Sequence, residues 1–228
     1  GIYGAGKSTF INNHLRPELG DAFHYLLPDD LVQAYGYQQG TPEFHHGIIE
    51  PMIRGYLKSG KPLLYETTLT SKNDEKWMPG DPIGLDDYLD HMPCDFDRIR
   101  LAKEQGYDVE LYYIGLGSPE KHNQFVAERE ALGGSPIDFK YIKNRYNKSL
   151  RNLPIAMLLA DKTHLIDNSN KDFKKVGELV AGKVVYLKDP FPSFIEAIET
   201  ARSGSTKASV QELLAFPIRE YPERQMEM

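Results

Sequence analysis

The chain has 228 residues, a formal net charge of −6 and a pI near 5.7. This length suits one α/β domain, and the acidic balance provides no general positive field for a long nucleic acid or an anionic membrane. The one cysteine, Cys94, excludes an internal disulfide and a cysteine-rich zinc cluster. No apolar run is long enough to span a bilayer. We therefore expect a soluble protein, cytoplasmic by default, whose partners include neither long nucleic acid nor membrane.

The first nine residues, Gly-Ile-Tyr-Gly-Ala-Gly-Lys-Ser-Thr, fit the pattern G-x-x-x-x-G-K-[ST] of a phosphate-binding loop, or P-loop. In such loops the glycines let backbone N–H groups converge on anionic oxygens, the lysine reaches the β- and γ-phosphates, and the serine ligates Mg²⁺. The alternative is a chance glycine-rich turn. The pattern predicts nucleotide binding by Gly1, Gly4, Ala5, Gly6, Lys7, Ser8 and Thr9, with Ser8 as the metal ligand. Because a P-loop follows a buried strand, we also expect a first strand to be missing before Gly1.

Short apolar runs then alternate with helical patterns along the chain. Strands are expected at 23–27, 63–65, 107–116 and 165–166, and helices at 41–58, 86–91, 96–105 and over most of 118–159. This alternation predicts an α/β fold of the P-loop NTPase class, with a doubly wound, mainly parallel sheet flanked by helices. The kinase-sized domain would span 1–200, with a helical lid at about 118–159.

The remaining segments carry weaker signals. We expect an edge strand at 184–187, a helix at 194–201, a flexible link at 202–206 and a final helix at 210–216. Residues 201–228 would then form a linker and a C-terminal tail helix.

Carboxylates and arginines indicate which P-loop chemistry to expect. Asp29, Asp30 and Glu66 follow expected strands, whose carboxyl ends face the ligand crevice in this class of fold. Phosphoryl transfer to a small molecule needs a carboxylate that takes the acceptor proton and arginines that neutralise charge. GTPases instead need an Asn-Lys-x-Asp motif, which the chain lacks, and Leu63 to Glu66 resembles the acidic strand of a motor ATPase only loosely.

The order and spacing of these motifs resemble the zeta toxin family of P-loop kinases. Besides the P-loop, the matching segments are Leu27-Pro-Asp29-Asp30-Leu31, Tyr65-Glu-Thr-Thr-Leu-Thr-Ser71, Ala102-Lys-x-x-Gly106-Tyr-x-Val-x-Leu111, Arg129-x-x-x-Gly133-Gly134, Arg145-Tyr-x-x-Ser-Leu-x-Asn-Leu153 and Asp167-Asn168-Ser169. Together they cover the chain from its first residue to about Ser169. Each motif is short, so the specificity of the resemblance comes from their sequence order.

The resemblance implies a kinase that uses ATP and Mg²⁺ to phosphorylate the 3′-hydroxyl of UDP-N-acetylglucosamine or a related nucleotide-sugar. It implies an antitoxin protein as a partner. Carried over to this chain, the catalytic residues are Lys7, Asp29, Arg129 and Arg145, and the residues at the acceptor are Asp30, Glu66 and Thr67. Asp30 is the alternative base. Structural alternatives are that Asp29 or Asp30 caps a helix and that Glu66 accepts bonds from backbone or hydroxyl groups.

The chain departs from the family pattern at two places, and these departures leave alternative functions open. Phe125 stands where many relatives carry an arginine, and Gly133-Gly134-Ser135 replaces a Gly-Gly-His. Either change could alter the acceptor, because a fold does not determine a substrate. The alternatives are a kinase for a nucleotide cofactor or an RNA end, and an ATP-dependent regulatory binding protein without catalysis.

Overall fold

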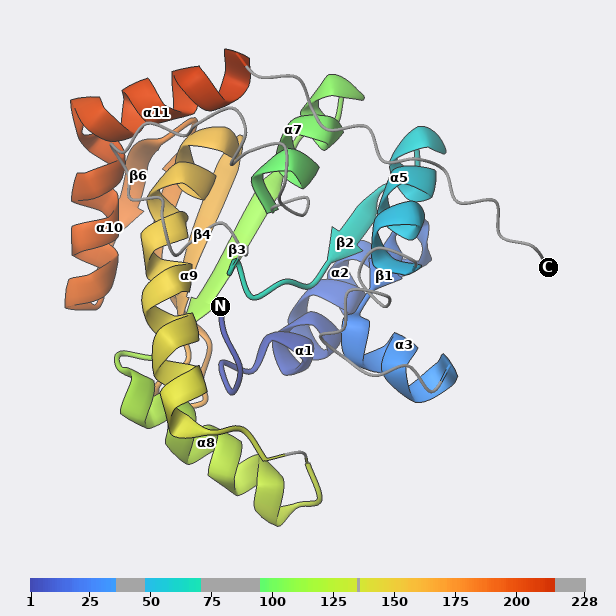
Figure 1. Cartoon of the computed structure of the whole chain (residues 1–228), viewed down its shortest axis with the longest axis vertical. Coiled ribbons are helices and arrows are strands. Elements are labelled where there is room, and N and C mark those ends of the chain that lie inside the picture. The colour runs from blue at the N-terminus through green and yellow to red at the C-terminus, as the bar shows by residue number, and fades with distance from the viewer. Residues whose placement is uncertain (36–47, 71–94, 135, 216–228) are drawn as a thin grey trace. The chain divides into compact units, whose positions relative to one another are not determined.

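The computed structural model describes residues 1–35, 48–70, 95–134 and 136–215. The chain is a mixed α/β protein that divides into two compact units (Figure 1). The smaller unit holds residues 8–66, and the larger unit holds residues 1–7 together with the described residues from 67 to 215. The division passes between Lys7 and Ser8 and again between Glu66 and Thr67, so that each unit has its own sheet.

The smaller unit is built on two parallel strands, in which Leu26 of β1 lies opposite Tyr65 of β2. Its elements are α1 (Lys7–Phe10), a π-helical turn (Ile11–Leu15), α2 (Arg16–Leu19), a 3₁₀ turn (Gly20–Ala22), β1 (His24–Leu26), α3 (Pro28–Tyr35), α5 (Glu50–Lys58) and β2 (Leu63–Tyr65). Helix α5 buries Ile53 and Leu57, which lie four residues apart on one face. His24 stacks on Tyr56 with 4.1 Å between ring centroids, which ties β1 to α5.

The larger unit has a four-stranded sheet in the order β3-β4-β5-β6. The strands are β3 (Glu110–Gly115), β4 (Lys162–Asp167), β5 (Lys174–Val180) and β6 (Lys183–Leu187). Strands β3 and β4 are parallel, whereas β5 and β6 continue the sheet antiparallel. The prediction of parallel strands flanked by helices is confirmed, but two of this sheet's three pairings are antiparallel, so this sheet is not doubly wound throughout.

The antiparallel part arises from a hairpin that the sequence reading missed. Between β5 and β6 the chain turns through Ala181 and Gly182, both at positive φ (46° and 71°). Two such residues in a two-residue loop give the turn whose twist matches paired strands. Only the second strand was expected, at 184–187. All five residues of β6 are exposed at this edge of the sheet.

Among the described residues, five helices accompany this sheet, and α9 contacts each of the other four (Figure 1). They are α7 (Asp95–Glu104), α8 (Pro119–Ala131), α9 (Phe139–Leu159), α10 (Pro192–Arg202) and α11 (Gly204–Ala215). Leu153 of α9 and Leu165 of β4 are fully buried in the core that they share with Phe194 of α10. Tyr113 of β3 packs edge-on against Phe194, at 5.7 Å between ring centroids.

Several expected elements differ in extent. The link expected at 202–206 is shorter, because α11 begins at Gly204 and places Leu213 in the core. Pro51 lies in the first turn of α5, and residues 48–49 before this helix are π-helical. The expected helix at 86–91 and most of the amino-terminal half of the expected helix at 41–58 lie outside the described residues. Within the described part of the chain, no helix is both long and apolar enough to cross a membrane.

Truncating a core side chain should test the role of α9 as the centre of the larger unit. We expect Leu153→Ala to lower the free energy of unfolding by about 2–5 kcal/mol, because a buried leucine is lost and a cavity remains. Leu132→Ala is the matched control, since Leu132 is 90% exposed and its loss should cost less than about 0.5 kcal/mol. Urea denaturation measures both. Equal effects of the two substitutions would contradict this assignment of the core.

Candidate functional site

The residues of the predicted P-loop form a turn-rich loop that leads into α1. Gly4 and Gly6 adopt positive φ values of 73° and 84°, a region that only glycine enters freely. The Ala5 N–H donates to the Ile2 carbonyl at 3.3 Å, and the Lys7 ammonium donates to the same oxygen at 3.2 Å. The Lys7 side chain therefore folds back over the start of the loop.

Neighbouring groups occupy the space that side chains would need at three glycines of this loop. A Cβ at Gly1 would lie 1.7 Å from the Ile114 carbonyl oxygen of β3, and one at Gly4 would lie 2.8 Å from the His122 carbonyl oxygen of α8. At Gly6 a Cβ would lie 2.7 Å from the side-chain nitrogen of Asn168. Since real Cβ atoms do not approach backbone atoms so closely, packing requires glycine at Gly1 and Gly4. At Gly6 the neighbour is a side chain, and the positive φ of 84° is the stronger constraint.

Two side chains of the larger unit bind carbonyl groups of the loop. His122 of α8 lies with Nδ1 2.8 Å from the Tyr3 carbonyl oxygen, and Asn168, just after β4, donates from Nδ2 to the Ala5 carbonyl at 2.9 Å. Both side chains are buried. The sequence reading gave neither residue a role. Two signals were available for Asn168: its position directly after a parallel strand, where residues face a ligand crevice in α/β folds, and its place in the segment Asp167-Asn168-Ser169 that resembles zeta toxins.

Burial controls the protonation of His122. It lowers the pKa of His122 to about 4, against the opposing effect of the bond to the Tyr3 carbonyl and with a further contribution from the Lys7 charge. The imidazole is therefore neutral near pH 7. Since a carbonyl can only accept, its single N–H lies on Nδ1.

The smaller unit brings together two of the predicted site residues. The Ser8 hydroxyl donates to the Glu66 carboxylate at 2.9 Å, and the Glu66 N–H continues the strand pairing by donating to the Leu26 carbonyl at 3.1 Å. Asp29 and Asp30 follow β1 in the first turn of α3, and both are exposed. Acidic residues in the first turn also stabilise a helix, so the structural alternative for these aspartates stays open.

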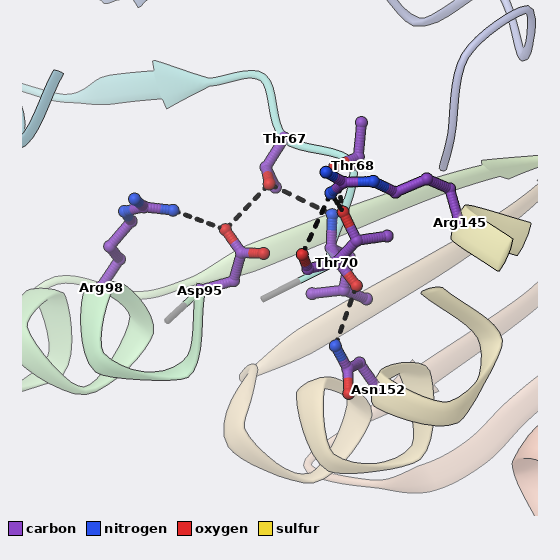
Figure 2. Close-up of polar contacts among 8 residues, drawn as sticks. Thr67, Thr68, Thr70, Asp95, Arg98, Arg145 and Asn152 are labelled. Atoms are coloured by element: carbon purple, nitrogen blue, oxygen red, sulfur yellow. Dashed lines mark hydrogen bonds and ion pairs between the residues drawn. The ribbon is translucent and has the colours of Figure 1, made fainter. Parts of the chain in front are cut away.

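Thr67 opens a segment in the larger unit that polar groups hold in place (Figure 2). Its hydroxyl donates to Asp95 of α7 at 2.8 Å and accepts the Leu69 N–H at 3.1 Å. Arg98 donates to the same Asp95 oxygen at 2.7 Å. The Thr67 hydroxyl thus fixes the backbone, and its predicted contact with the acceptor remains a prediction.

Helix α9 binds the carbonyl groups of the next three residues in this segment. Ser149 donates to the Thr68 carbonyl at 2.9 Å, Asn152 to the Leu69 carbonyl at 3.0 Å and Arg145 to the Thr70 carbonyl at 3.2 Å. Figure 2 shows the Arg145 guanidinium reaching the Thr70 hydroxyl as well. Arg145, predicted as a catalytic arginine of the lid, is therefore engaged in holding the 67–70 segment.

The other predicted arginine lies on α8. Arg129 packs against Gly134, whose N–H donates to the Arg129 carbonyl at 3.0 Å. At Phe125, where an arginine was expected from the family pattern, the Lys171 ammonium lies 5.0 Å from the ring centroid and pairs with Glu128 at 2.6 Å. A positive charge therefore reaches this place from the turn after β4, a segment separate in sequence.

Mg²⁺ prefers oxygen ligands and retains several waters or phosphate oxygens. The Ser8 hydroxyl and the Glu66 carboxylate are adjacent oxygen groups of this kind. Over the described ranges, no group of three or more histidine, cysteine or acidic residues could hold a metal ion. The Ser8 and Glu66 oxygens fit an ion that takes its other ligands from phosphate oxygens and water.

The neutral His122 should make stability depend on pH. Its folded pKa lies below the usual value of 6.5, so the unfolded chain binds the extra proton as the pH falls through 6.5 to about 4. We expect the free energy of unfolding to fall over this window, by up to about 3 kcal/mol from this residue. His164, whose pKa burial also lowers, adds a background in the same direction. Urea denaturation of His122→Gln at a series of pH values should show a free energy of unfolding that depends less on pH than that of the wild type. The same pH dependence in both proteins would contradict the lowered pKa of His122.

Comparisons with known proteins agree with this fold. No family model matches the chain, and no curated protein matches it in sequence. A solved structure from the PezAT chromosomal toxin–antitoxin system of Streptococcus pneumoniae is similar, with a TM-score of 0.54 over 94% of this chain and 81% of that chain, at 15% identity. A likeness at this identity establishes the fold. The resemblance to zeta toxins that the motifs indicated is thus confirmed at the level of the fold.

Proposed function

We propose that the protein is an ATP-dependent kinase that transfers the γ-phosphoryl group to a hydroxyl of a small molecule. The observation that carries this proposal is the loop of residues 1–7. Its two positive-φ glycines alternate with residues whose carbonyls are bound by the protein, and Lys7 ends it at the start of a helix. Backbone loops of this form bind phosphate oxygens through their N–H groups.

Each predicted residue has a defined part in such a transfer. Lys7 would exchange its bond with the Ile2 carbonyl for the β- and γ-phosphate oxygens, and Ser8 and Glu66 are the residues that would hold Mg²⁺. When bound, the metal supplies positive charge that offsets the charge of the transferred group. Asp29 accepts the proton of the acceptor hydroxyl. At the same time the hydroxyl oxygen of the acceptor bonds to the γ-phosphorus, and ADP leaves. Asp30 is the alternative base.

The acceptor and the partner are the finer parts of the proposal. The resemblance to zeta toxins supports a nucleotide-sugar such as UDP-N-acetylglucosamine as the acceptor, with Asp30, Glu66 and Thr67 on the acceptor side. Arg129 and Arg145 would neutralise transferred charge, which for Arg145 requires release from the Thr70 carbonyl. An antitoxin protein is the proposed partner, as in the toxin–antitoxin system of the structural neighbour.

Substituting the base should separate chemistry from binding. We expect Asp29→Asn to lower the turnover of ATP and acceptor by about 10²–10⁴-fold, the usual contribution of a positioned base, while ATP affinity changes less than about twofold. Asp21→Asn, an exposed aspartate of the same unit, is the control and should behave as the wild type. Coupled-enzyme kinetics and calorimetry measure the two quantities. If Asp30→Asn alone removes turnover, the base is Asp30.

Removing the phosphate-binding lysine should affect binding itself. We expect Lys7→Ala to weaken ATP binding by about tenfold or more and to abolish measurable transfer, because the charge on the β- and γ-phosphates is no longer offset. Radiolabelled ATP offered with UDP-N-acetylglucosamine, nucleotide cofactors and short RNAs identifies the acceptor. Saturable ATP binding without product from any of these would favour a regulatory binding protein instead.

A further inference from the structure

Side chains from two elements of the larger unit hold carbonyl groups at alternate residues of the loop. His122 of α8 binds the Tyr3 carbonyl and Asn168 after β4 binds the Ala5 carbonyl, at 2.8 and 2.9 Å. Both side chains are almost fully buried, at 1% and 3% exposed. These bonds are therefore shielded from competing water.

Peptide planarity converts the two bonds into a constraint on N–H groups. In a trans peptide the carbonyl of one residue and the N–H of the next point in opposite directions. Holding the carbonyls of Tyr3 and Ala5 therefore turns the N–H groups of Gly4 and Gly6 away from His122 and Asn168. Both glycines have positive φ, the conformation that brings successive N–H groups into an anion-binding concavity.

The amide of Asn168 is oriented by what it contacts. Reversing it would set Oδ1 against the Ala5 carbonyl oxygen, so Nδ2 must face the loop. Oδ1 is then buried without a hydrogen-bond partner among the described residues. A buried acceptor left unpaired costs stability. Packing alone does not explain an asparagine at this position, whereas its donor function does.

We infer that Asn168 and His122 are positioning residues that hold the loop's N–H groups in the orientation that binds the phosphates of ATP. The inference rests on the proposed function, because it assumes that this loop binds a nucleoside triphosphate. Neither side chain needs to touch the nucleotide. The two residues act through the carbonyl groups of Ala5 and Tyr3.

Exchanging one atom of Asn168 tests the inference. Asn168→Asp keeps the shape but replaces the donor with a carboxylate oxygen, so that the Ala5–Gly6 peptide loses its anchor. It also adds a negative charge, and the uncharged His122→Leu variant separates that effect from the loss of the anchor. We expect the affinity for MgATP to fall about tenfold or more and that for AMP, which lacks the β- and γ-phosphates, to fall less than about threefold. Calorimetric titration measures both. Asn152→Asp is the matched control: it removes a buried amide bond of 3.0 Å to the Leu69 carbonyl and should leave the ratio of the two affinities unchanged.

A second pair of variants keeps the test decisive if Asn168→Asp fails to fold. His122→Leu removes the donor to the Tyr3 carbonyl, whereas His122→Gln offers an amide N–H in its place. We expect the leucine variant to lose ATP affinity selectively and the glutamine variant to recover part of it. Wild-type ATP affinity in folded Asn168→Asp or His122→Leu, or equal losses for ATP and AMP, would overturn the inference. Absence of ATP binding by the wild type would instead remove the proposed function.

Discussion

The candidate site depends on a backbone that has no room for side chains. At Gly1, Gly4 and Gly6 the space beside the Cα atom is filled by a β3 carbonyl, an α8 carbonyl and the amide of Asn168. The loop therefore takes its path from three separate parts of the larger unit. Because two of these glycines also have positive φ, the path cannot be reached by another residue without strain. The chemistry proposed for Lys7 follows from where this path ends.

In the larger unit, side chains bind main-chain carbonyl groups in the loop of residues 1–7 and in the 67–70 segment. In both places the contacts come from buried or half-buried groups, and in both they orient peptide planes rather than side chains. Thr67 begins the second segment directly after Glu66, which accepts from Ser8 in the smaller unit. The chain passes between the units after Lys7 and again after Glu66. The loop before the first point and the 67–70 segment after the second are the segments whose backbone is fixed.

Local signals in the sequence predicted most of the regular structure. Leu63–Tyr65 was predicted with the bounds that the structure has, because its short apolar run lies between a Gly-Lys-Pro turn and an acidic residue. The hairpin partner β5 was missed because Lys174, Lys175 and Glu178 conceal the alternation around Val176, and because Ala181 gives little sign of positive φ. Sequence neighbours cannot reveal it, since its pairing with β4 is a tertiary contact.

The candidate site also contains residues that the sequence predicted and residues that it did not. The P-loop could be read from the sequence because its function requires fixed residue types at fixed spacing. The side chains that hold it could not be identified, because His122 and Asn168 are 119 and 163 positions from their partners Tyr3 and Ala5. Nor did the sequence show that Lys171 approaches Phe125, the position at which the family pattern has an arginine. Such relations depend on which elements pack together.

The contacts between α9 and the 67–70 segment restrict mutation in the helix more than in the segment. Its donors Arg145, Ser149 and Asn152 lie on one helical face and meet three consecutive main-chain oxygens. Main-chain oxygens are present whatever the residue type, so replacements at 68 and 69 would leave these attachments in place. A single-residue insertion in α9 between Arg145 and Ser149 would rotate one part of that face by about 100° relative to the other and separate the donors from their acceptors. During evolution the spacing of the donors along α9 is therefore more tightly restricted than the residue types of the 67–70 segment.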